Sequence, residues 1–196
     1  MTASLISVIG PPAVGKTTLA EWLAAAMPAM LIRENFADNP FLADSYTAGR
    51  QICLPAQLHF LISRVGQLSR AGWPADGAVV TDYGFCQDRI YAAMKLDAGE
   101  LALYDQLAAR LGGLVVAPSV VIHLDASVGT LKSRIVARGR VFERAMDEAF
   151  LSHMRRAYDN IDAELPCPVI RADCDTVDLL LPRARRRLLQ QVRSRL

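Results

Sequence analysis

The chain has 196 residues, of which 52% are hydrophobic and 21% are charged, so it is long enough to bury the core of one compact domain. Its formal net charge of +2 is too small to indicate binding to nucleic acid or to an anionic membrane surface. The longest apolar runs are interrupted by glycine and proline and are too irregular to span a bilayer, and the first ten residues lack the basic region of a signal peptide.

Short apolar segments alternate along the chain with longer segments of helical periodicity. The short ones are β-branched and apolar on both faces, as buried parallel strands are, and cover residues 4–9, 29–33, 78–82, 119–125 and 168–172. Helices are expected near residues 16–27, 55–71, 84–95, 98–111, 127–138, 147–163 and 176–195. This succession predicts a single α/β domain over residues 1–196, with a five-stranded parallel sheet flanked by helices on both faces.

A glycine-rich segment directly follows the first expected strand. Residues 10–18 read GPPAVGKTT and match G-x-x-x-x-G-K-[ST] at every fixed position, between a strand and a helix. Glycines let the backbone curl so that its N–H groups converge on a phosphate at the helix N-terminus. In such a loop Lys16 reaches the β- and γ-phosphates and the Thr17 hydroxyl ligates Mg²⁺. We therefore predict a three-layer sandwich of the P-loop NTPase type that binds ATP through Gly10, Pro11, Pro12, Ala13, Val14, Gly15, Lys16, Thr17 and Thr18.

This loop does not identify the reaction, because GTPases, ATPase motors and small-molecule kinases all use it. The sequence has no N-K-x-D segment with which a GTPase would read guanine, and it is short for a motor domain. Kinases of small substrates are therefore the leading class.

A carboxylate stands where the second strand is expected to end. Glu34 begins the segment ENFADNPFLADSY, and ligands of open α/β sheets bind outside the carboxyl ends of the strands. A carboxylate there can accept the proton of an attacking hydroxyl, which phosphoryl transfer to an alcohol requires. The alternative is an ordinary surface glutamate in a loop.

Together with the phosphate loop, four further segments resemble the deoxynucleoside kinase family, especially its bacterial members, in the same order along the chain. They are EN…NPFL…Y from residue 34, PAQLHFLISRVGQL from residue 55, VVTDYGFCQDRIYA from residue 79 and RGRVFE from residue 138. The resemblance implies ATP-dependent phosphorylation of the 5′-hydroxyl of a deoxynucleoside in nucleotide salvage. It also implies a homodimer built from the helices after the second and third strands.

The resemblance also implies roles for single residues. Glu34 would be the base that takes the 5′-hydroxyl proton. Tyr46 and Glu143 would bind the 3′-hydroxyl of the deoxyribose, and Gln57 would pair with the edge of the nucleobase. The arginines of a lid over residues 138–146 would close over the phosphates during transfer; these are Arg138 and Arg140.

The sequence departs from the family pattern at the end of the third strand. Many members have an acidic residue followed by arginine and serine there, whereas this chain has Asp82, Tyr83 and Gly84. The carboxylate is kept, so Asp82 is expected to hold Mg²⁺ through water. The missing arginine leaves three readings open: the lid arginines compensate for it, turnover is slow, or the substrate differs.

The expected helix after the second strand carries candidate base-reading residues. Gln57 and Arg64 are seven residues apart and so share one helix face. Asp88 is spaced from Asp82 as in relatives that carry a Gln, Arg and Asp set and accept purines as well as deoxycytidine. We therefore expect deoxyadenosine or deoxyguanosine to be preferred over thymidine; the alternative is that Arg64 and Asp88 form an ordinary surface pair. The opposite face is expected to be core-like and carries Leu58, Leu61, Ile62, Val65 and Leu68.

The remaining chemically versatile residues give structural readings. The four cysteines, at 53, 86, 167 and 174, fit no zinc pattern and are expected to be reduced thiols in a cytoplasmic protein. His123 lies in a buried strand pattern and is expected to be a hydrogen-bonded core residue, while the arginines of the last helix are expected to face water. Two other functions stay open: a P-loop kinase for another small alcohol or a nucleoside monophosphate, and a nucleotide-binding regulatory module with little turnover.

Overall fold

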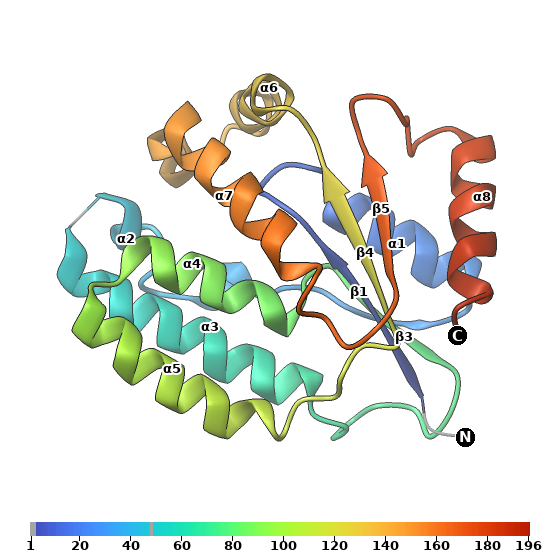
Figure 1. The fold of residues 1–196 in the computed structure, drawn as a ribbon, viewed down its shortest axis with the longest axis horizontal. Coiled ribbons are helices and arrows are strands. Elements are labelled where there is room, and N and C mark those ends of the chain that lie inside the picture. Colours follow the sequence, from blue (N-terminus) through green and yellow to red (C-terminus); the bar gives the residue numbers. More distant parts are fainter. Residues whose placement is uncertain (1–2, 48) are drawn as a thin grey trace.

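The computed structural model describes residues 3–47 and 49–196 and contains one sheet of five parallel strands (Figure 1). Its order is β2-β3-β1-β4-β5. The strands are β1 (Ser4–Ile9), β2 (Met30–Ile32), β3 (Ala78–Thr81), β4 (Val120–Asp125) and β5 (Val169–Asp173). The predicted α/β sandwich and all five strands are confirmed. No strand end lies more than one residue from its predicted position.

Helices cover both faces of this sheet, as the sequence predicts (Figure 1). α1 (Lys16–Ala26) and α8 (Pro182–Arg193) lie on one face, and α3 (Cys53–Leu68), α4 (Asp88–Lys95) and α7 (Glu148–Ile161) lie on the other. α5 (Ala98–Gly112) packs on α3, and α6 (Val128–Arg138) follows β4. No helix among the described residues is long and apolar enough to cross a membrane.

The central strand β1 is buried on both faces, as a parallel strand covered by two helical layers must be. Ile6 and Val8 belong to the core cluster that includes α1 and α8. Leu5 and Ile9 point to the opposite layer, where they join clusters that include α3 and α7. Because β1 occupies the middle of the sheet, the phosphate loop that follows it lies at the centre of the edge formed by the carboxyl ends of the strands.

Several helix boundaries differ from the sequence prediction for local reasons. The helix expected from residue 84 begins at Asp88, after a 3₁₀ turn over Phe85–Gln87 in which the Gln87 side chain accepts from the Gly84 amide. The helix expected from residue 176 begins at Pro182, whose fixed φ suits the first helical turn. The long segment 34–54 contains the short helix α2 (Asp44–Thr47) and two 3₁₀ turns, and its residue 48 lies outside the described residues.

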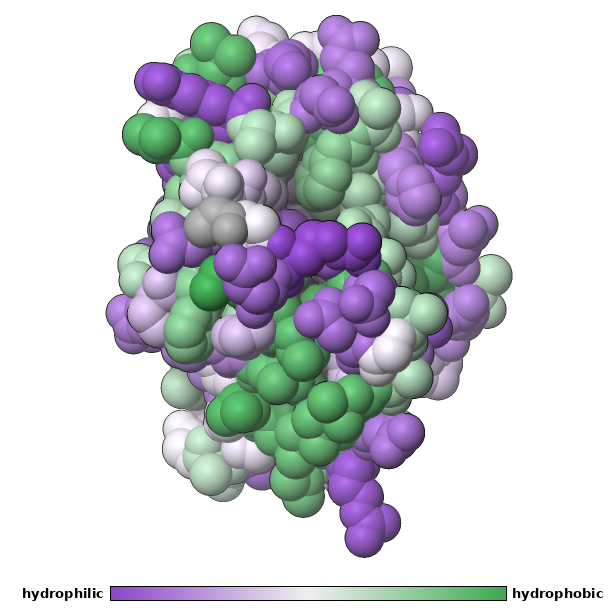
Figure 2. Space-filling view, turned by 90° about the vertical axis from the view of Figure 1, so that its left-hand side faces the viewer, coloured by the Kyte–Doolittle hydropathy of each residue, from purple (hydrophilic) through white to green (hydrophobic). Residues whose placement is uncertain are grey.

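One prediction about α3 was wrong. Leu61, Val65 and Leu68 are buried as expected, but Ile62 is 64% exposed. The buried stripe of α3 also takes in Gln57 and Arg64, so the polar and apolar candidates share the inner side of the helix. Ile62 therefore lies on the outer side of the helix. Figure 2 shows apolar side chains gathered over the lower part of the face that it draws.

The structural readings of the histidine, the cysteines and the last helix are confirmed. The buried His123 forms a hydrogen bond from Nδ1 to Asp162 at 2.9 Å, and all four cysteines are free thiols. Leu188 and Val192 of α8 are buried, and most of its arginines are exposed. The exception is Arg185, which is partly buried with its guanidinium 5.2 Å from the centre of the Trp22 ring.

Candidate active site

The phosphate loop joins β1 to α1 and has the backbone shape that its glycines permit. Gly10 has a φ of +141°, and a Cβ atom there would lie 2.2 Å from the carbonyl oxygen of Leu124. Gly15, which precedes α1, has a φ of +112°. The Lys16 ammonium folds back over the loop and donates to the carbonyl oxygens of Gly10 at 2.8 Å and Pro11 at 2.9 Å. The loop therefore surrounds a cationic group at a helix N-terminus, an arrangement that favours anions.

Lys16 is a buried ammonium. Burial lowers its pKa to about 8, although the nearby carboxylates of Glu34 and Asp82 act in the opposite direction. Within residues 3–47 and 49–196, no carboxylate pairs directly with it. A phosphate group entering the loop would supply the anion that this ammonium lacks.

Asp82, at the end of β3, connects the phosphate loop to the second strand. Its Oδ2 accepts a hydrogen bond from the Thr17 hydroxyl at 2.6 Å, and its Oδ1 accepts one from the backbone N–H of Glu34 at 2.7 Å. The carboxylate and hydroxyl oxygens lie side by side, and both are ligand types that Mg²⁺ accepts. Among the described residues no group of three or more His, Cys, Asp or Glu side chains could hold a metal ion, so a magnesium ion here would also need water and phosphate oxygens.

Arg64 of α3 is shared by two carboxylates. Its Nη2 donates to Oε1 of Glu34, and its Nη1 forms an ion pair with Oδ1 of Asp88. The guanidinium, whose carbon lies 5.0 Å from the centre of the Phe60 ring and 5.4 Å from that of Tyr83, is almost fully buried. Burial alone would lower the pKa of Arg64, but Glu34 outweighs this effect and raises it. The alternative of a surface pair between Arg64 and Asp88 is therefore wrong.

Tyr83 stands where many family members have an arginine, and it does not line the cleft. Its side chain is fully buried, and its hydroxyl donates to Oε1 of Gln67 at 2.7 Å. Residue 83 thus points away from the cleft, and the cation paired with Glu34 in this structure is Arg64. Both lid arginines contact Glu143.

The segment predicted as a lid folds inward. Glu143 is only 3% exposed and accepts from Arg138 Nε at 3.0 Å and from Arg140 Nη1 at 3.4 Å. The neighbouring Phe142 ring lies 5.7 Å from that of Tyr46, centre to centre. The segment therefore brings both lid arginines and the candidate sugar-binding pair to one cleft.

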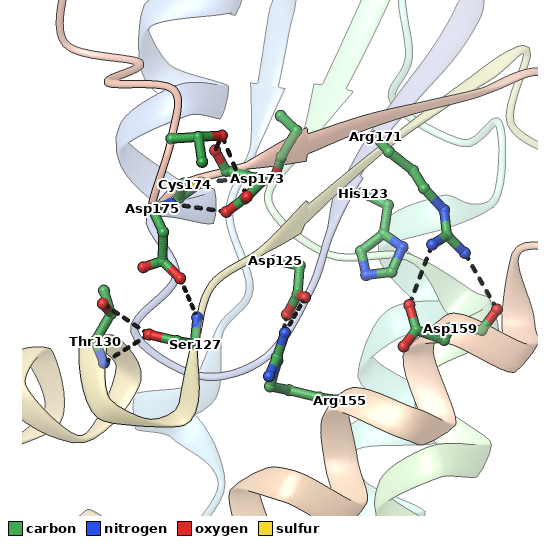
Figure 3. Close-up of polar contacts among 12 residues, drawn as sticks. His123, Asp125, Ser127, Thr130, Arg155, Asp159, Arg171, Asp173, Cys174 and Asp175 are labelled. Atoms are coloured by element: carbon green, nitrogen blue, oxygen red, sulfur yellow. Dashed lines mark hydrogen bonds and ion pairs between the residues drawn. The ribbon is translucent and has the colours of Figure 1, made fainter.

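The segments after β4 and β5 lie at the opposite end of the cleft, and Figure 3 shows the polar contacts that connect them. Asp175 accepts from the backbone N–H of Ser127 at 2.6 Å, which ties the segment after β5 to the start of α6. Asp125 pairs with Arg155 of α7 through contacts of 2.8 and 2.5 Å. These contacts fix the loop that begins at Asp173 beside the phosphate loop.

Most of these groups border one cleft of about 770 Å³. Its middle is the phosphate loop; Gln57, Phe60 and Tyr91 lie at one end and the segment from Cys174 to Leu180 at the other. The volume is within the upper range for small-ligand sites and leaves room on both sides of the loop.

The family model for deoxynucleoside kinases matches residues 6–196 of this chain. The chain belongs to the deoxynucleoside kinase family. It is therefore a phosphotransferase that phosphorylates a deoxynucleoside with ATP, as the resemblance implies.

Individual relatives agree with this assignment. The chain is 29% identical to the deoxyguanosine kinase of Bacillus subtilis over 92% of its own length and 91% of the relative. It is 30% identical to the deoxyadenosine kinase of Dictyostelium discoideum over 85% of its length and 70% of the relative. Among solved structures, the deoxyadenosine kinase of M. mycoides with bound dATP has a TM-score of 0.81 at 19% identity, with 97% of this chain and 99% of that chain covered. This likeness confirms the fold.

The structure brings most of the predicted site residues of this kinase to the cleft. Gly10 and Pro11 support the phosphate loop from outside the lining, and Asp88 lies behind Arg64, buried and without a place on the cleft wall. The predicted residues that line the cleft are Pro12, Ala13, Val14, Gly15, Lys16, Thr17, Thr18, Glu34, Tyr46, Gln57, Arg64, Asp82, Arg138, Arg140 and Glu143.

Other lining residues were not predicted. Arg134, whose Nη1 donates to the carbonyl oxygen of Val14 at 3.1 Å, lies one turn before Arg138 on α6, and this i, i+4 spacing was a signal that could have found it. Lys95 and Arg185 gave no such signal. Lys95 is the last residue of α4 and Arg185 lies in the first turn of α8, so no spacing within one helix relates them to the other site residues. Four aromatic residues that line the cleft of this kinase were also not predicted: Phe36, Phe60, Tyr91 and Phe142.

Proposed function

We propose that this kinase transfers the γ-phosphate of Mg·ATP to the 5′-hydroxyl of a purine deoxynucleoside, with Glu34 as the general base. The observation that carries the proposal is the guanidinium of Arg64, which joins Glu34 at the centre of the cleft to Asp88 beside the base-binding end. One cation thus holds a carboxylate suited to proton transfer and a second one suited to base recognition.

Glu34 is well placed for the proton transfer. It lines the cleft beside the phosphate loop, its backbone N–H is held by Asp82, and its carboxylate is oriented by Arg64. A general base has to be fixed within hydrogen-bond reach of the hydroxyl that it deprotonates. The proton of the 5′-hydroxyl passes to Glu34 as the oxygen attacks the γ-phosphate.

The base-binding end suits a purine. Gln57, 4% exposed, offers one donor and one acceptor to an amide-like base edge. Beside it, Arg64 lines the cleft and can donate to a purine N7 or O6, while Asp88 pairs with its guanidinium from behind. The methyl group of thymidine would meet this polar pair and leave it imperfectly satisfied, at a cost of roughly 1–3 kcal/mol. The names of the relatives, deoxyguanosine and deoxyadenosine kinases, agree with this preference.

The donor site is the phosphate loop. Its N–H groups and Lys16 would hold the phosphates of ATP, and Thr17 and Asp82 would hold Mg²⁺, which would neutralise phosphate charge. Arg138 and Arg140 leave Glu143 and turn to the transferred phosphate, which frees Glu143 to bind the sugar 3′-hydroxyl together with Tyr46.

An exposed apolar surface supports a homodimer, and the free thiols support a location in the cytoplasm. Three leucine or isoleucine side chains on α3 and α5 are exposed: Ile62 at 64%, Leu103 at 47% and Leu107 at 39%. Figure 2 shows an apolar patch on the face that it draws. Exposed apolar patches of this kind mark interaction sites. Four free thiols agree with a reducing compartment. A single light-scattering mass of 21.4 kDa at micromolar concentration would contradict the dimer.

A nucleoside monophosphate is the less favoured acceptor. Its phosphate would need a free cation at the acceptor end, whereas Arg64 is already held by two carboxylates. A neutral hydroxyl acceptor requires no such cation.

A phosphate-transfer screen of the eight common nucleosides with labelled Mg·ATP tests the proposal. We expect labelled 5′-monophosphate from deoxyadenosine or deoxyguanosine, and strong loss of product in Lys16→Ala. Nucleoside monophosphates and small alcohols form separate arms of the screen. If no nucleoside yields product the proposed function fails, and product in another arm identifies the alternative.

A further inference from the structure

Lys95, the last residue of α4, reaches across the cleft wall to the short helix α2. Its Nζ donates to Oγ of Ser45 at 3.0 Å and contacts the Ser45 carbonyl oxygen at 3.4 Å. The same ammonium lies 3.1 Å from the centre of the Tyr46 ring. One side chain thus joins two elements that are 50 residues apart in the sequence.

α2 needs such support. It has four residues, Asp44–Thr47, and a helix of one turn is not stable by itself in water. Ser45 is its fixed point: its Oγ donates to the Leu42 carbonyl oxygen at 2.7 Å, and its own carbonyl oxygen accepts from the Cys53 thiol at 3.6 Å. Lys95 adds a connection to α4, a longer helix that packs against α3 and α7.

The ammonium is occupied by these contacts. Burial lowers the pKa of Lys95 to about 8, and in residues 3–47 and 49–196 it forms no ion pair with a carboxylate. Two of its three N–H groups face the oxygens of Ser45, and the face of the Tyr46 ring takes the positive charge. An ammonium used in this way has little left to offer a substrate, so Lys95 acts through its neighbours.

Tyr46 is the neighbour that matters for the reaction. Its side chain lines the cleft, and its ring packs 5.7 Å from the Phe142 ring, next to Glu143. The ring is therefore held between Lys95 on one element and the lid segment on another. The attraction between the cation and the ring face holds the ring in position.

We propose that Lys95 is a positioning residue that sets the selectivity of this kinase for acceptors with a 3′-hydroxyl, by holding the Tyr46 ring where its hydroxyl meets the sugar. This inference rests on the proposed function, in which Tyr46 and Glu143 bind that hydroxyl.

The test compares deoxyguanosine with 2′,3′-dideoxyguanosine as acceptors. The ratio of their kcat/KM values is measured for wild type, Lys95→Met, Lys95→Arg, Tyr46→Phe and the double variant Lys95→Met/Tyr46→Phe. We expect Lys95→Met to lower the ratio about tenfold, and Lys95→Arg to retain most of it, because a guanidinium can also lie on the ring and donate to Ser45. In the Tyr46→Phe background, Lys95→Met should change the ratio no further.

Lys132→Met is the matched control. Lys132 on α6 is also partly buried and donates to the carbonyl oxygen of Met146 at 3.3 Å, but it does not contact Tyr46. Its substitution should leave the ratio unchanged. Calorimetric binding of the two acceptors to wild type and Lys95→Met gives a readout that is independent of turnover.

Two results would overturn the inference: an equal loss with both acceptors in Lys95→Met, or a further fall of the ratio in the double variant. Failure of the proposed function looks different. It appears in wild type and Tyr46→Phe, as the absence of nucleoside phosphorylation or as a ratio that Tyr46→Phe does not alter.

Discussion

Arg64→Leu removes the cation that Glu34 and Asp88 share. Arg64 is 5% exposed, so its loss leaves the buried carboxylate of Asp88 and the partly buried one of Glu34 without their partner. Breaking a buried ion pair from one side costs about 3–5 kcal/mol. For a chain of this length each kcal/mol lowers the melting temperature by about 2–4 °C, so we expect a fall of roughly 6–20 °C.

Urea unfolding in the absence of nucleotide measures this cost. The triple variant Arg64→Leu/Glu34→Gln/Asp88→Asn removes all three charges and should recover most of the lost free energy of unfolding, because no unpaired charge stays buried. Arg89→Leu is the control: Arg89 pairs with Asp105 on the surface at 3.0 Å, and its loss should cost less than about 1 kcal/mol. The reasoning is refuted if Arg64→Leu unfolds within 1 kcal/mol of wild type, or if the triple variant is no more stable than the single one.

Three further substitutions test the site. Glu34→Gln keeps the size of the side chain but removes the base, so kcat should fall by about 10²–10⁴ with little change in calorimetric nucleoside affinity; a kcat near that of wild type would exclude Glu34 as the base. Asp88→Ala should change the ranking of the four deoxynucleosides by kcat/KM, and an unchanged ranking, or thymidine as the best wild-type substrate, contradicts purine reading. Gly10→Ala forces a Cβ against the Leu124 carbonyl oxygen at 2.2 Å and should lower the free energy of unfolding by at least about 2 kcal/mol, whereas Gly99→Ala, within α5, should be tolerated.

The sequence predicts those parts of this kinase that depend on local patterns. Buried parallel strands are apolar on both faces, so runs such as residues 4–9 and 120–125 are recognisable without knowledge of their neighbours. The phosphate loop is recognisable because its backbone conformation needs glycine at fixed positions. The placement of Glu34 and Asp82 follows from topology, because the carboxyl ends of parallel strands meet at one edge.

The side-chain partners were not predictable in the same way. Seven-residue spacing places Gln57 and Arg64 on one helix face, but it does not say that this face points inward beside Leu61. Which carboxylates a long guanidinium reaches depends on how α3 packs against α4 and the segment after β2, and that distance is set by the whole core. The contact of Lys95 with Tyr46 likewise joins the ends of two helices whose relative position no local pattern specifies.

The position of β1 has a consequence for how the enzyme is made. The strand and its phosphate loop are translated before β3 and β4, yet β1 pairs with both strands, and the loop closes against the carbonyl oxygen of Leu124. The nucleotide site therefore cannot be completed until translation has passed β4 and Leu124, since contacts so distant in sequence form only when both partners exist. A nascent chain stalled before β4 would carry the whole loop sequence and still be unable to retain ATP.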